Sequence, residues 1–113
     1  MSAERDALVR AAVAELHQEF GGKLPGRVAE LTTALQALRA APGDRALHDA
    51  ARATAHKLRG SAGSYGFPEV SVAAGCIEDA LSATDAGSLT DADPTWTTIT
   101  ATITELDRAA RAG

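Results

Sequence analysis

Apolar residues recur at helical spacing along most of the chain. One stripe lies within residues 3–20 and a second within 24–41, and both advance in steps of three and four, the period of an amphipathic helix. The first consists of Val9, Val13, Leu16 and Phe20, and the second of Leu24, Val28, Leu31, Leu35 and Leu38. We expect two helices, interrupted by Gly21 and Gly22. Pro25 would lie near the start of the second helix, where a missing N–H is harmless.

Three further helical segments follow, each separated from the next by turn residues. The segment 44–65 begins after "APGD", whose aspartate can cap it, and Gly66 suits the left-handed residue that ends it. The segment 68–83 opens with "FPE", which places a proline and an acid in its first turn. The segment 94–111 follows the polar loop "TDAGSLTDAD", whose last aspartate is a second capping residue.

These patterns predict an all-α fold, because no alternating strand pattern competes with them. The expected inner faces of the last three helices are Leu47, Ala51, Thr54, Leu58 and Ala62, then Val70, Ala73, Ala74, Ile77 and Leu81, and finally Trp96, Ile99, Ile103, Leu106 and Ala110. We expect an antiparallel up-down four-helix bundle of 24–41, 44–65, 68–83 and 94–111. The additional N-terminal helix 3–20 either packs on the bundle or extends its first member. Residues 1–113 then form one domain with its core at about 24–111.

Composition narrows the function classes. Hydrophobic residues make up 45% of the chain, with alanine common and aromatic residues rare, which favours closely packed helices. The net charge of −4 argues against nucleic acid as a partner. Cys76 is the only cysteine, so an internal disulfide is excluded, and we expect it to be a partly buried filler. Without a secretory signal or an apolar run long enough to span a membrane, we expect a cytoplasmic protein.

The stretch "AHKLRGSAGSYG", residues 55–66, places two glycines inside a predicted helix. Each costs about 1 kcal/mol relative to alanine. At about 100° per residue, His56 lies roughly 160° from the apolar stripe centred near Leu58, so it should face water. Gly60 and Gly63 share its face. Bare backbone beside an exposed imidazole leaves room for a large partner.

The surroundings of this histidine suit phosphoryl chemistry. Arg52 and Arg59 flank its face on one side and Lys57 on the other. A neutral imidazole is a nucleophile near neutral pH, and phosphoryl transfer needs in-line geometry and charge neutralisation, which these cations could provide. The glycines do not have the spacing of a phosphate-binding loop, and no Mg²⁺ site is recognisable. ATP and metal must therefore come with a partner.

The same stretch resembles the signature of the histidine-containing phosphotransfer (HPt) domain, in which a histidine is followed by any residue, leucine, lysine, glycine and small residues. The resemblance covers about residues 24–111. It implies that His56 is phosphorylated, that Gly60 leaves space for the partner, and that Ser61 belongs to the adjoining small positions. Arg59 stands where the family usually has lysine, which keeps the charge but replaces an ammonium with a planar guanidinium.

The resemblance extends to the next helix and to the partners. In "VAAGCIEDA", Glu78 falls where relatives carry a glutamine or glutamate that hydrogen-bonds the histidine ring. If it accepts the Nδ1 proton, the Nε2 lone pair points outward. The family implies response-regulator receiver domains and a histidine kinase or hybrid kinase as partners, with Mg²⁺ in the receiver. We expect a monomeric phosphoryl carrier without a cofactor or an ATP site of its own.

Other interpretations stay open at this point. His17 and His48 have no glycine or basic neighbours of this kind and are expected to be surface residues. In these interpretations, Glu78 is an ordinary solvated or salt-bridged acid, and Arg52 only solvates its face of the helix. The alternative function is a binding module that docks on a receiver or kinase and inhibits it without phosphorylation. A third is the substrate domain of a larger chemotaxis-type kinase, although the charged start "MSAERD" and the end "RAARAG" favour a separate chain.

Overall fold

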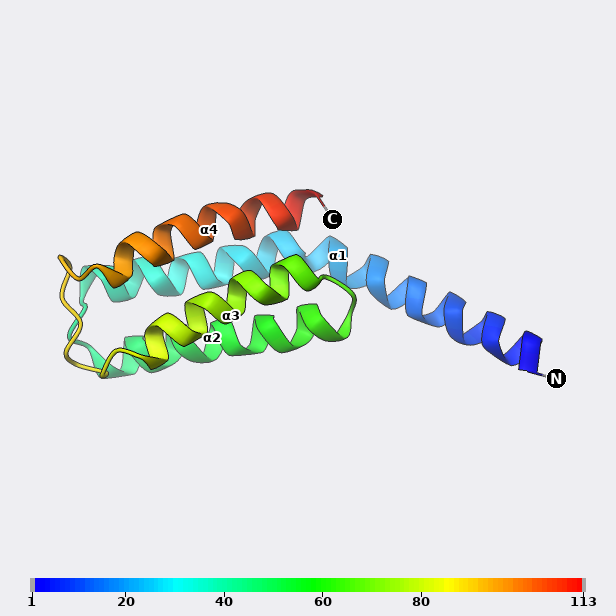
Figure 1. Ribbon diagram of the computed structural model, residues 1–113, viewed down its shortest axis with the longest axis horizontal. Coiled ribbons are helices and arrows are strands. Elements are labelled where there is room, and N and C mark those ends of the chain that lie inside the picture. Colours follow the sequence, from blue (N-terminus) through cyan, green and yellow to red (C-terminus); the bar gives the residue numbers. More distant parts are fainter. Residues whose placement is uncertain (1, 113) are drawn as a thin grey trace.

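Four helices account for most of residues 2–112, the part of the chain that this computed structural model describes. They are α1 (Ser2–Ala40), α2 (Arg45–Ser64), α3 (Pro68–Ser82) and α4 (Thr95–Ala112), and no strand occurs among the described residues. Each helix packs against its neighbours in the chain, and α4 returns to lie beside α1, which closes an antiparallel bundle (Figure 1). The predicted all-α four-helix bundle is confirmed. Met1 and Gly113, the ends of the predicted domain, lie outside the described residues.

The core is formed by the inner faces of all four helices. Burying one large apolar side chain stabilises the fold by roughly 1.5–3 kcal/mol. The largest apolar side chains that are fully buried are Leu24, Leu31, Leu38, Val70, Ile77, Leu81 and Leu106. The predicted inner face of α3 is buried throughout, and that of α4 is buried except for Ile103, which is half-buried. Leu89, from the loop before α4, adds a buried residue that helical periodicity could not predict.

The inner face of α2 differs from the prediction by a small rotation of the helix. Leu47 and Thr54 are only half-buried, and the buried residues are His48, Ala51, Ala55, Leu58 and Ala62. These five advance in regular steps of three and four, as one stripe on a helix must. Because one member of the stripe is a histidine, a search for apolar residues alone chose the neighbouring positions.

The interruption predicted at Gly21 and Gly22 is absent, because α1 runs without a break from Ser2 to Ala40. Pro25 therefore lies inside this helix and not near its start. Gly21 and Gly22 keep helical backbone. The Phe67 ring packs against Gly21, since a Cβ at this position would lie 3.1 Å from the ring. The N-terminal helix is thus an extension of the first bundle helix, the second of the two predicted arrangements.

The first half of α1 leaves the bundle and runs beyond it at an angle to the second half (Figure 1). Proline removes a backbone donor from the helix and commonly bends it, and Pro25 lies where α1 enters the bundle. Most of the first stripe is uncovered, because Val9, Val13 and Leu16 are all exposed. Only Phe20, at the edge of the bundle, is buried.

The turn between α2 and α3 fixes the relative position of these two helices. Gly66 has a φ of +87°, the left-handed conformation predicted for it, and the Phe67 N–H donates to the Ala62 carbonyl at 2.8 Å. His17 from α1 closes this turn. Its Nδ1 donates to the Tyr65 carbonyl at 2.8 Å and its ring stacks on Phe67, so the prediction of a plain surface histidine is wrong.

Both predicted aspartate caps are present. Asp44 accepts a hydrogen bond from the Leu47 N–H at 3.1 Å, and Asp93 accepts one from the Thr95 N–H at 2.9 Å. Cys76 is exposed, and not partly buried as expected. Among residues 2–112, no helix has the length and apolarity needed to cross a membrane. The same residues contain no group of three or more His, Cys, Asp or Glu side chains placed to hold a metal ion.

Candidate functional site

His56 lies on the open face of α2, and its side chain is 73% exposed. The helix places it there because Ala55 and Leu58 turn into the core on the opposite side. Gly60, one turn further along, is also exposed, and a Cβ at this position would meet no atom within 4 Å. The imidazole and the bare backbone thus form one open surface on α2.

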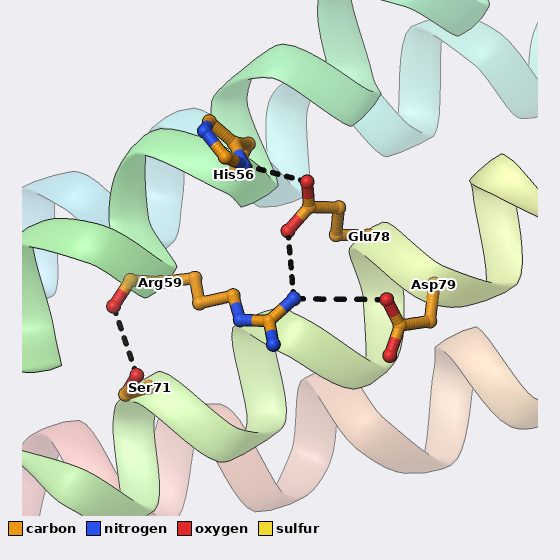
Figure 2. Close-up of polar contacts among 5 residues, drawn as sticks. All are labelled: His56, Arg59, Ser71, Glu78 and Asp79. Atoms are coloured by element: carbon orange, nitrogen blue, oxygen red, sulfur yellow. Dashed lines mark hydrogen bonds and ion pairs between the residues drawn. The ribbon is translucent and has the colours of Figure 1, made fainter.

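Glu78, from α3, contacts the histidine ring directly. Its Oε2 lies 2.6 Å from Nδ1 of His56 (Figure 2). The Glu78 side chain is only 14% exposed, so its carboxylate is held between the two helices. A carboxylate can only accept, and Nδ1 therefore carries the proton. The other ring nitrogen, Nε2, lies on the side of the ring away from Glu78 (Figure 2) and presents its lone pair.

The charge state of Glu78 follows from two opposing effects on its pKa. Partial burial acts to raise the pKa of the carboxyl, while hydrogen bonds from Arg59 and His56 and their nearby charge act to lower it. The hydrogen bonds and charges together outweigh burial, and the pKa of Glu78 is lowered. Glu78 is therefore ionised at neutral pH and is an acceptor for the ring proton.

Arg59 reaches the same carboxylate from the other side. Its Nη1 donates to Oε1 of Glu78 at 3.1 Å and lies 3.6 Å from Oδ1 of Asp79 (Figure 2). To reach both acids, the side chain passes over Gly75, where a Cβ would lie 3.1 Å from Nε of Arg59. The guanidinium is thus directed at the acids of α3, and it orients Glu78 toward His56.

Asp79 and Gly75 were not among the residues selected from the sequence. Gly75 lies three residues before Glu78 and four before Asp79, so the glycine shares one side of α3 with both acids. That spacing was the available signal. It becomes informative only once the arginine on α2 is known to cross this side of α3.

Gly63 does not resemble Gly60, although both were expected to line the open face. A Cβ at Gly63 would lie 3.2 Å from Oγ of Ser71 on α3. Ser71 donates from Oγ to the Arg59 carbonyl at 2.8 Å, which joins the two helices at this level. The missing side chain of Gly63 therefore permits the close approach of α3, so this glycine supports the bundle beside the site.

The remaining basic and small residues selected from the sequence lie around His56 and form no side-chain hydrogen bond or ion pair with its ring within the described residues. Arg52 and Lys57 are exposed and form no ion pair within residues 2–112. Lys57 and Ser61 line a shallow hollow beside α2, and Ser61 is half-buried. Of the three basic residues, only Arg59 belongs to the network that holds Glu78.

His48 is the other histidine of α2, and its prediction as a surface residue is wrong. It is 2% exposed, and its Nε2 donates to the Leu81 carbonyl at 2.8 Å. Its Nδ1 has no hydrogen-bond partner among the described residues. The reason is its place in the buried stripe of α2, seven residues before Ala55. This histidine belongs to the core.

Comparison with models of known protein families matches residues 8–109 to the Hpt domain. No curated protein and no solved structure was found to match the chain. Hpt domains are helical bundles that carry phosphoryl groups in two-component signalling, where they interact with receiver domains and histidine kinases. The matched span includes His56, Glu78 and the whole bundle, and it covers nearly the whole chain. The chain therefore belongs to the Hpt domain family.

Proposed function

We propose that this chain relays a phosphoryl group through His56, between an aspartate of a kinase or receiver and the aspartate of a response-regulator receiver. The observation that carries the proposal is the hydrogen bond of 2.6 Å between Nδ1 of His56 and Glu78, on an imidazole that is 73% exposed. It fixes one nitrogen and leaves the other free for the partner. The whole chain is taken as one functional domain.

In the forward step, Nε2 of His56 attacks the phosphorus of an aspartyl phosphate on the receiver. The Nε2–P bond forms while the bond between phosphorus and the aspartate oxygen breaks, and the aspartate leaves with the electron pair as a carboxylate. The Nδ1 proton stays on the ring. Positive charge that develops on the imidazole is stabilised by the ionised Glu78, which Arg59 holds in place. The reverse step returns the phosphoryl group to a receiver aspartate.

The open face of α2 provides the docking surface for the receiver. Gly60 lies one turn from His56 with no atom near its missing side chain, so a partner can approach the ring closely. Lys57 and Arg52 are the exposed cations of this surface that make no ion pair within the described residues, and we assign them to the phosphoryl oxygens or to acids of the partner. The metal and the aspartate belong to the receiver.

The proposal is tested by incubating the full chain with a receiver domain that carries a labelled aspartyl phosphate. We expect transfer of an acid-labile, alkali-stable label to this chain. Gly60→Gln should slow the transfer by about tenfold or more through obstruction of docking, whereas Gly60→Ala should transfer nearly normally and be slightly more stable, since alanine favours helix. Binding of the receiver without any label on this chain would instead identify the phosphorylation-independent docking module.

A further inference from the structure

The first half of α1 carries most of the exposed large apolar side chains of the described residues. We call residues 2–19 of α1 the rod; it is about 27 Å long and projects beyond the bundle (Figure 1). Leu8, Val9, Val13 and Leu16 are exposed by 72, 56, 59 and 46%, respectively. Val9, Val13 and Leu16 continue the stripe that α1 buries in the bundle from Phe20 onward. Apolar side chains gathered on one face of a projecting helix mark an interaction surface.

Charged residues flank this stripe in a definite order, and one acid, Asp6, lies within it at the free end, seven residues before Val13. Seven residues make nearly two helical turns, so Arg5, Ala12 and Glu19 lie on one flank, and Arg10 lies on the other. No charged residue between positions 4 and 19 takes part in an ion pair inside the described portion of the chain. One flank of the rod is therefore positive near its free end and negative near the bundle.

A second copy of the same rod, running in the opposite direction, matches both the stripe and the charges. We propose that this chain self-associates through an antiparallel pairing of two rods. With Ala12 opposite Ala12 of the second copy, Arg5 lies beside Glu19 of the second copy. The twofold symmetry of such a pair produces this contact twice. The same alignment places Leu16 of each rod beside Val9 of the other, and it covers the stripe.

The charges and the bundles both disfavour a parallel pair. In parallel two-stranded packing, the flank of one helix faces the opposite flank of its partner, which brings Arg5 beside Arg10 of the second copy. A parallel pair would also crowd two bundles at one end of the rods. Because the rod projects from one end of the bundle (Figure 1), the antiparallel pair places the two bundles at opposite ends.

The pairing leaves the phosphotransfer face open. The rod meets the turn at residues 65–67 through His17 and continues beyond it, and His56 lies more than two helical turns before that turn on α2. The contact is also small, because only about four turns of helix meet on each side. Interfaces of this size are weak, and we expect a dissociation constant of about 1–100 µM.

Sedimentation velocity of the full chain, at about 1 µM to 1 mM, measures this association directly. We expect the mass to rise from 11.6 kDa toward twice that value as concentration increases. Val13→Asp should weaken the association by about 100-fold or more, because it places a charge in the centre of the stripe on both copies. Val72→Asp changes an exposed valine on α3 and is the matched control, expected to associate like the parent.

A charge exchange tests the antiparallel direction separately from any damage to the rod. Arg5→Glu and Glu19→Arg should each weaken association by roughly tenfold, since each creates two like-charge contacts. The double variant should return to within about twofold of the parent.

A parent that stays monomeric at every concentration, or whose association is lost in Val72→Asp but kept in Val13→Asp, would overturn self-association through the rod. Two weak single variants without recovery in the double variant would overturn the antiparallel alignment. Because His56→Gln should associate like the parent, the outcome is independent of the phosphotransfer proposal.

Discussion

Two histidines of α2 are in opposite situations. His48, in the first turns, and His56, eight residues or about 12 Å further along, both form a hydrogen bond to α3, at 2.8 and 2.6 Å. The partner of His48 is the Leu81 backbone carbonyl and its ring is buried, whereas the partner of His56 is the Glu78 carboxylate and its ring is exposed. A well-held histidine ring is therefore not sufficient to identify a reactive one.

The difference between the two rings lies in the second nitrogen and in the charge of the acceptor. Nδ1 of His48 is enclosed and has no partner within residues 2–112, so nothing from solvent can reach it. Nε2 of His56 faces away from Glu78 into the open. A carbonyl selects a tautomer, but an ionised carboxylate also stabilises positive charge that develops on the ring. These two features separate a core residue from a candidate nucleophile.

The largest expected effect is on phosphorylation itself. We expect His56→Gln to lose the acid-labile label from a phosphorylated receiver entirely, while its free energy of unfolding changes by no more than about 0.5 kcal/mol, since the ring is mostly exposed. His48→Gln is the matched variant on the same helix and should still accept label when folded. Label that persists in His56→Gln would place the phosphoryl group elsewhere.

The second expected effect is on stability and concerns His48, the buried histidine of α2. His48→Ala should lower the free energy of unfolding by about 2–4 kcal/mol, because it leaves a cavity in the core and removes the donor to the Leu81 carbonyl. Urea denaturation of parent and variant measures this loss. If His48→Ala were as stable as the parent, the ring would not be part of the core, and the contrast with His56 would fail.

The charge of the acceptor is the next element of the comparison. Glu78→Gln keeps an oxygen acceptor for Nδ1 but removes the charge, so transfer should slow severalfold; Glu78→Ala also removes tautomer selection and should slow it by about tenfold or more. Rates of label transfer, together with ¹⁵N NMR of the His56 ring to identify the protonated nitrogen, measure the two effects. Equal rates in all three proteins would reduce Glu78 to a structural acid.

The sequence predicted the fold and the exposed face of α2 better than its buried face. Repeated steps of three and four gave the four helices, and the angle between His56 and Leu58 gave the open face. The same reasoning missed His48. The stripe that α2 actually buries includes this polar residue, so it looks less apolar than the neighbouring stripe that was predicted. It also left open whether the first stripe of α1 is covered, since periodicity identifies an apolar face but not whether another segment of the chain reaches it.

Contacts between helices were the least predictable part of the site. Glu78 was reached through family resemblance, but Gly75 and Asp79 acquire meaning only from the path of Arg59 across α3. Gly21 is similar, since its space is filled by a ring from a turn far along the chain. A local pattern carries no information about which long side chain will cross a given position.

The smallest expected effect tests whether the crossing of Arg59 over Gly75 supports His56, the proposed site of phosphorylation. A Cβ at position 75 would lie 3.1 Å from Nε and 3.3 Å from Cζ of Arg59, so Gly75→Ala should displace the guanidinium by a few tenths of an ångström and loosen its hold on Glu78. We expect transfer to slow about two- to fivefold, a loss of roughly 0.4–1 kcal/mol, even though alanine should stabilise the helix by up to about 1 kcal/mol. Arg59→Lys removes the planar group that the Cβ would press against, so the same Gly75→Ala change should have little effect on transfer in that background. The rates of the four proteins form a double-mutant cycle, and a coupling energy near zero would mean that Gly75 has no part in positioning Arg59.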